Sequence, residues 1–104
     1  GGMLVRQGDI YIESVRCLPD GATKQFSTAL ADGELTGHSH RILDFRTASV
    51  LHLGVEMFVD VTADRAEVVH EEHATIALNR GVYRVWRQRE YDSSVAFRQR
   101  YVVD

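Results

Sequence analysis

Four of the five histidines lie in two short groups, and grouped imidazoles can bind a metal or transfer protons. One group is Gly37-His38-Ser39-His40-Arg41 and the other is His70-Glu71-Glu72-His73. Residues two apart on an extended strand point to the same side, so His38 and His40 should project together, in line with a core-facing Ile42. The first group therefore predicts two imidazoles at the rim of an apolar interior.

The second group is placed by the same spacing. His70 follows Ala66 and Val68 at intervals of two, so it should lie just beyond inward-facing residues at the end of another strand. We expect His38, His40 and His70 to meet at one mouth of a β-barrel, with His73 as an alternate or fourth member. The remaining histidine, His52, alternates away from an apolar face and is expected to be an exposed strand residue.

Three imidazoles from neighbouring strands form a ligand set for a divalent metal, with Zn preferred and Fe, Mn or Ni as alternatives. Three protein ligands leave a coordination position for water, whose pKa the metal lowers toward ~7. The histidines thus predict a metal-dependent hydrolase or lyase that acts on a small molecule. The order His-Glu-Glu-His is not the zincin motif, because that motif separates its histidines by four positions on a helix.

Charged neighbours supply the other catalytic groups of this hypothesis. Glu72 shares the parity of Val68 and His70 and is the predicted general base, whereas Glu71 is predicted to support an imidazole N–H. Arg41 would stabilise developing negative charge. If residues 62–73 form a helix instead of a strand, His70 and His73 share a face and the two glutamates exchange roles.

Two other interpretations of the histidines remain open. A pair without metal could share acid and base work on a phosphodiester, with Arg41 holding the charge. Alternatively, the imidazoles are strand-end and loop residues that bond to backbone carbonyls.

The elements that would position these side chains are mostly strands, since the hydrophobic period is two. Alternation predicts strands at residues 10–15 and 74–78. Between residues 50 and 61 it predicts a strand with a core face at the apolar odd positions, with a bulge or tight turn at Gly54 as an alternative to a continuous strand. These positions are Leu51, Leu53, Val55, Met57, Val59 and Val61. Turn residues recur at 18–21, 32–33 and 79–81. Only residues 62–73 have a composition that also suits a short helix. We expect an all-β fold, a small antiparallel barrel or sandwich, with at most one short helix.

Length and composition set the outer limits. The chain has 104 residues, a formal net charge of −3 and 44% hydrophobic residues, which suits one domain over residues 1–104. Its single Cys cannot form an internal disulfide, and no apolar run approaches the ~20 residues of a membrane span. We expect a cytoplasmic protein without membrane contact, in which Gly1 and Gly2 are an expression-vector remnant.

The last quarter of the chain suggests a second function. Residues 82–91 interleave Tyr, Trp and Arg, a pattern that could stack bases and contact phosphates. The alternative to a metal enzyme is therefore a non-catalytic module that binds nucleic acid or a protein. Residues 82–91 and 101–103 also resemble unprotected edge strands, which favours a homodimer.

Particular residues of the chain resemble two known families. Between Gly33 and His73, the His-x-His pair followed by a third His resembles the cupin superfamily, whose small jelly-roll barrels bind a divalent metal through such residues. Over nearly the whole chain, the sequence resembles a family of short uncharacterised bacterial proteins. That resemblance is carried by Arg6-Gln7-Gly8-Asp9, the two histidine groups and Arg87-Gln88-Arg89-Glu90-Tyr91, and it implies no particular substrate.

Overall fold

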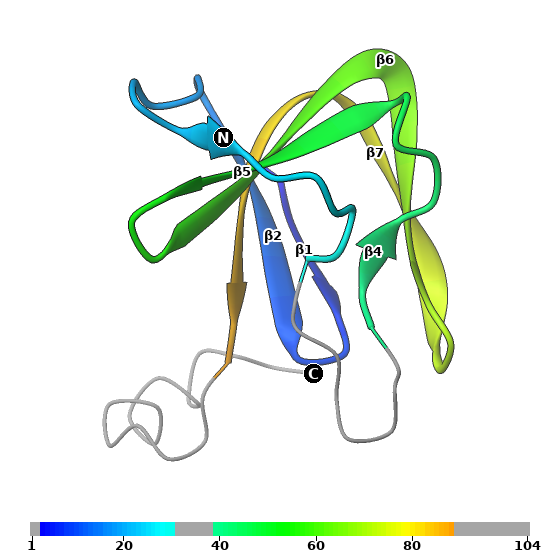
Figure 1. The fold of residues 1–104 in the computed structure, drawn as a ribbon. Coiled ribbons are helices and arrows are strands. Elements are labelled where there is room, and N and C mark those ends of the chain that lie inside the picture. The colour runs from blue at the N-terminus through cyan, green and yellow to red at the C-terminus, as the bar shows by residue number, and fades with distance from the viewer. Residues whose placement is uncertain (1–2, 31–38, 89–104) are drawn as a thin grey trace.

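A computed structural model describes residues 3–30 and 39–88, which form seven β-strands and no helix (Figure 1). The strands are β1 (Leu4–Gln7), β2 (Ile10–Val15), β3 (Thr23–Lys24), β4 (Arg41–Ile42), β5 (Ala48–Leu53), β6 (Glu56–His70) and β7 (His73–Arg87). All pairs are antiparallel, in the order β1-β2-β7-β6-β5-β3, and β4 pairs with β6 outside this order. The prediction of an all-β antiparallel fold is confirmed, and the single bent sheet is consistent with a small barrel or sandwich.

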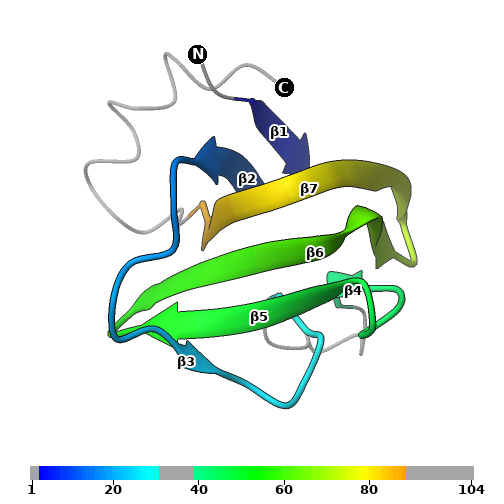
Figure 2. The same ribbon diagram turned by 90° about the horizontal axis from the view of Figure 1, so that it is seen from above.

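The long hairpin of β6 and β7 gives the molecule its shape. Both strands have 15 residues, and they arch together over one end of the fold (Figures 1 and 2). Their register shifts twice, between Val61 and Arg65 and between Val68 and His70. Irregularities of this kind bend and twist a ladder. Away from the hairpin tip, β7 pairs with β2 and β6 pairs with β5. Near the tip, β6 pairs with β4.

Residues 62–73, for which a helix was the alternative, continue β6 and then turn at Glu71 and Glu72. Period-two burial explains the strand, because Ala66 and Val68 are 1% and 0% exposed while residue 65 is exposed and residues 67 and 69 are half-buried. No helix in the described part of the chain is long and apolar enough to cross a membrane.

The core lies on the concave side of the sheet. Its fully buried side chains come from four strands, namely Ile10 and Ile12 of β2, Ile42 of β4, Val59, Val61 and Val68 of β6, and Leu78 of β7. Burial of each such side chain contributes roughly 1.5–3 kcal/mol. This apolar interior supports the rim on which the histidines lie.

The expected core face of residues 50–61 was wrong at Leu53 and Val55, whereas the alternative of a tight turn at Gly54 is confirmed. Gly54, with φ of 62°, and Val55 form the turn between β5 and β6, because Leu53 pairs directly with Glu56. The inward positions of β5 are therefore Ala48 and Val50. Val55 is fully exposed, and Leu51 packs outside the main core, opposite Phe58.

The predicted edge was also wrong. β7 lies between β2 and β6, and its residues 82–85 are paired on both sides. Trp86 stacks on Tyr11 of β2 with ring centroids 5.5 Å apart. Among the described strands, β1 and β3 end the sheet. Homodimerisation stays a prediction, while residues 89–91 and 101–103 lie outside the described residues.

Candidate histidine site

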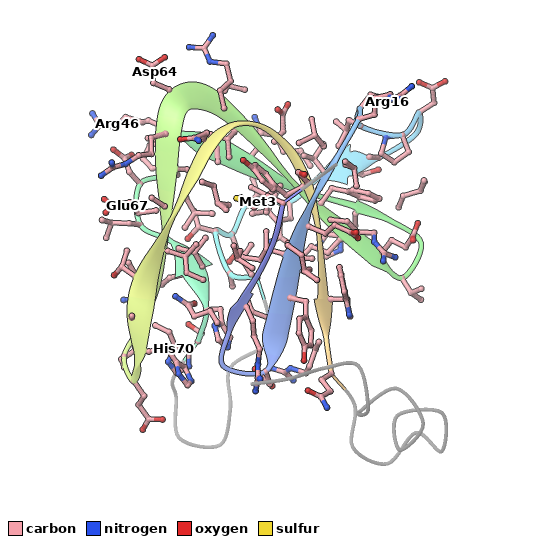
Figure 3. The ribbon with its side chains drawn as sticks, turned by 180° about the vertical axis from the view of Figure 1, so that it is seen from behind. Met3, Arg16, Arg46, Asp64, Glu67 and His70 are labelled. Atoms are coloured by element: carbon pink, nitrogen blue, oxygen red, sulfur yellow. The ribbon has the colours of Figure 1, made fainter. Side chains whose placement is uncertain are left out.

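Pairing between β4 and the tip half of β6 brings the two histidine groups together. Arg41 lies opposite Val69 and Ile42 opposite Val68, which places His40 beside His70. His70 ends β6, His73 begins β7, and the two are a cross-strand pair around the Glu71-Glu72 turn. Figure 3 shows His70 at this hairpin tip, its side chain directed toward the body of the fold.

The three imidazoles lie close together. Ring centroids are 4.3 Å apart for His40 and His70, 4.6 Å for His70 and His73, and 5.9 Å for His40 and His73. His40 is buried, His70 is half-buried and His73 is exposed. We call these three side chains, with Gln7 and Asp9, the histidine site. The fourth predicted ligand, His38, lies outside the described residues.

Gln7 connects His40 to an irregularity in the β6–β7 ladder. Val68 pairs with Ile76 and His70 with His73, so Val69 stands opposite two residues, Ala74 and Thr75. The Gln7 amide nitrogen donates to Val68 O at 3.0 Å and to Ala74 O at 2.8 Å, and its oxygen lies 2.8 Å from His40 Nδ1. The Gln7 residue is only 3% exposed.

Asp9 approaches His40 from the opposite side of the ring. Its Oδ1 lies 3.1 Å from His40 Nε2, and its Oδ2 lies 3.0 Å from Arg87 Nε. The Gln88 N–H donates to the Asp9 backbone oxygen at 2.9 Å, which holds the β1–β2 turn against the end of β7. Asp9 thus links the histidines to Arg87 at the end of β7.

Gly8 gives the imidazoles their space. It adopts φ of 59° in the turn between β1 and β2, and a Cβ added there would lie 2.5 Å from His73 Nε2 and 3.2 Å from His40 Cε1. Such distances are closer than van der Waals contact, so the bare backbone of the turn is what allows both rings to lie against it.

Burial lowers the pKa of His40 below its ordinary value of 6.5. Donation from Nε2–H of the protonated ring to Asp9 opposes this shift, and the neighbouring imidazoles of His70 and His73 add to it. His40 is therefore mainly neutral at neutral pH.

The predicted catalytic groups lie around the hairpin tip. Glu71 accepts from Ser39 N at 3.3 Å and from Arg41 Nη1 at 3.0 Å, so it holds the segment that carries His40 on the β6–β7 turn. The Glu72 backbone N–H donates to His70 Nδ1 at 3.0 Å. Because Glu72 lies in the turn, the strand-parity argument does not apply to it, and the predicted roles of Glu71, Glu72 and Arg41 stay predictions.

Side chains in the described ranges are not arranged to hold a metal ion as they stand. Within residues 3–30 and 39–88, no group of three or more His, Cys, Asp or Glu side chains meets that requirement. The contacts of Gln7, Asp9 and the Glu72 backbone with imidazole nitrogens account for the present ring orientations.

The chain matches one family model, over residues 6–88. It belongs to the family described as domain of unknown function DUF8820. No curated protein and no solved structure matches the chain. The matched range includes both histidine groups, Gln7 and Asp9.

Sequence reasoning missed Gln7 and Asp9. Neither belongs to a periodic histidine pattern, and about thirty residues separate them from His40 along the chain. The available signal was the motif Arg6-Gln7-Gly8-Asp9, which supported the family resemblance but to which sequence reasoning assigned no role in the site.

Arg84 of β7 lies among an aromatic ring and two carboxylates of the neighbouring strands. The Arg84 guanidinium lies 4.5 Å from the Trp86 ring centroid and 3.8 and 3.5 Å from carboxylate oxygens of Glu13 and Glu56. Nucleic-acid or protein binding by this strand stays a prediction.

Proposed function

We propose that the histidine site binds a divalent metal, with Zn preferred, through His40, His70, His73 and the carboxylate of Asp9. The observation that carries the proposal is the gathering of three imidazoles and one carboxylate from separate parts of the chain at one rim of the core. Imidazole and carboxylate are ordinary zinc ligands, and the mixture also accepts Fe, Mn or Ni. His38 is a further candidate on the same segment as His40.

The ring separations support this ligand set. A tetrahedral ion with nitrogen ligands at about 2.0–2.1 Å keeps the centroids of its imidazoles roughly 5 Å apart. The observed separations range from 4.3 to 5.9 Å. The separations thus lie on either side of this value, and ligation through His70 Nδ1 would require its ring to turn away from the Glu72 N–H.

The proposed activity is metal-dependent hydrolysis or lyase chemistry on a small molecule. Such a metal would lower the pKa of a bound water, and the exposed side of the site, formed by His73 and the half-exposed Asp9, gives a substrate access. Glu72 is the proposed base and Arg41 the proposed stabiliser of negative charge. We place this activity in the cytoplasm, where the exposed thiol of Cys17 stays reduced.

Titration of untagged protein with Co²⁺, followed by visible absorption, tests the ligand set. His73→Asn is the informative variant because His73 is exposed and its replacement leaves the core intact. We expect its affinity for the metal to fall by at least about 100-fold, since the loss of even an indirect support costs 10–100-fold. His52→Asn is the matched control, because His52 contacts Gln25 on another part of the sheet. Equal affinities for the two variants would contradict the proposal.

A further inference from the structure

We propose that Gln7 is a positioning residue that fixes His40 in the tautomer with its proton on Nδ1, so that the Nε2 lone pair faces Asp9. The effect on metal affinity rests on the proposed function, whereas the tautomer itself does not. Nothing in the family description assigns a role to Gln7.

The orientation of the Gln7 amide follows from its partners. Val68 O and Ala74 O are backbone carbonyls, which only accept hydrogen bonds. The NH₂ group must therefore face them, and both of its hydrogens are used. The oxygen of the amide is left to face His40, and the burial of Gln7 excludes solvent as an alternative partner for most of its surface.

The tautomer of His40 follows in turn. The Gln7 oxygen can only accept, so His40 Nδ1 must donate at 2.8 Å. In the neutral ring the one N–H lies on Nδ1, which leaves Nε2 without a proton, 3.1 Å from Asp9 Oδ1. Two acceptors then face each other, and a proton or a metal ion between them satisfies both. Metal-bound histidines commonly donate their second N–H to an oxygen in this way.

The bulge explains why the position needs glutamine. It leaves two carbonyls directed at one point, and a third group, His40 Nδ1–H, requires an acceptor there. Glu keeps the acceptor but loses the two donors as a carboxylate, and Met loses all three functions. The Glu variant therefore removes the bonds to the bulge and keeps the acceptor that selects the His40 tautomer, whereas the Met variant removes both.

The chain contains a matched internal control. The Gln25 amide nitrogen donates to Ser27 O and Ala29 O, both at 2.8 Å, and its oxygen contacts His52 Nε2. The same reasoning places the proton of His52 on Nε2, the opposite nitrogen. One spectrum should therefore show His40 and His52 in opposite tautomers.

Two-bond ¹H–¹⁵N correlation spectra of metal-free protein at about pH 8, above the ordinary histidine pKa, distinguish the tautomers. We expect Nδ1–H for His40 and Nε2–H for His52. Gln7→Glu should keep the Nδ1–H form of His40. Gln7→Met should shift His40 toward Nε2–H and lower the metal affinity about 10–100-fold, whereas Gln25→Met should affect His52 alone.

A wild-type His40 in the Nε2–H form overturns the inference without any variant, even if Gln7→Met does not fold. An unchanged His40 spectrum in a folded Gln7→Met protein also overturns it. Opposite tautomers in a protein that binds no metal leave the role of Gln7 standing and refute the proposed function. Metal binding by a protein whose His40 carries its proton on Nε2 refutes the role of Gln7 and leaves the proposed function standing.

Discussion

At the scale of single residues, backbone shape matters to the histidine site as much as the side chains do. Parity along a strand correctly placed His40 on the same inward face as Ile42, and both are almost fully buried. It could not place Gln7 or Asp9, because the β1–β2 turn reaches the site only after the sheet has curled. Nor did parity supply His73, whose position comes from cross-strand pairing with His70.

Gly8→Ala tests the importance of the turn. Gly8 and Gly54 have φ of 59° and 62°, so alanine costs about 1–2 kcal/mol of strain at either position. Only at Gly8 would the new Cβ also meet His73 Nε2, whereas Gly54 has nothing within 4 Å. Strain should lower the free energy of unfolding by similar amounts in Gly8→Ala and Gly54→Ala, and the contact with His73 should lower it further in Gly8→Ala. Urea denaturation measures both variants. Metal affinity should fall about 10-fold or more only for Gly8→Ala, and an unchanged affinity would contradict this role.

At the scale of elements, the β6–β7 hairpin shows what the sequence could and could not predict. Alternation identified strands at 10–15, 50–61 and 74–78, and it left residues 62–73 ambiguous because Ala, Asp and Glu also suit a helix. Bulges depend on which residues face each other across a ladder, and hydrophobic alternation within one strand does not contain that information. The turn at Gly54, which the sequence offered as an alternative, changes the inward positions from even numbers in β5 to odd numbers in the first half of β6.

Tyr83 stabilises the bend of this hairpin. Its hydroxyl donates to Asn79 O at 2.7 Å, and burial raises the pKa of Tyr83 above its ordinary value of 10.0. Because the pKa of Tyr83 is raised on folding, the protonated phenol contributes its full stabilisation at pH values below the pKa of the unfolded state. This contribution is lost as the pH rises through the pKa of the folded state. Tyr83→Phe should cost about 0.5–1.5 kcal/mol at neutral pH. It should also make the loss of stability above pH 10 shallower. Urea denaturation at neutral and alkaline pH measures both effects, and an equally steep alkaline loss in the variant would refute the assignment.

At the scale of the whole molecule, the apolar interior does not depend on the histidine site. Residues of β2, β4, β5, β6 and β7 form one buried cluster, and each large side chain in it contributes roughly 1.5–3 kcal/mol. We expect the protein to keep its fold when a chelator removes the metal. Far-ultraviolet circular dichroism should be nearly unchanged, and complete unfolding would show that the metal is structural.

Metal content is the most direct measurement of the proposed function. Protein expressed without a histidine tag, purified without chelator and freed of loosely bound ions by gel filtration is analysed by elemental mass spectrometry, with His73→Asn prepared in parallel. The proposal predicts one divalent ion per chain, mainly Zn, and a much lower content in His73→Asn. A wild-type protein that contains only trace metal, and that takes up none when Zn²⁺, Fe²⁺, Mn²⁺ or Ni²⁺ is added, would contradict the metal site at His40, His70, His73 and Asp9.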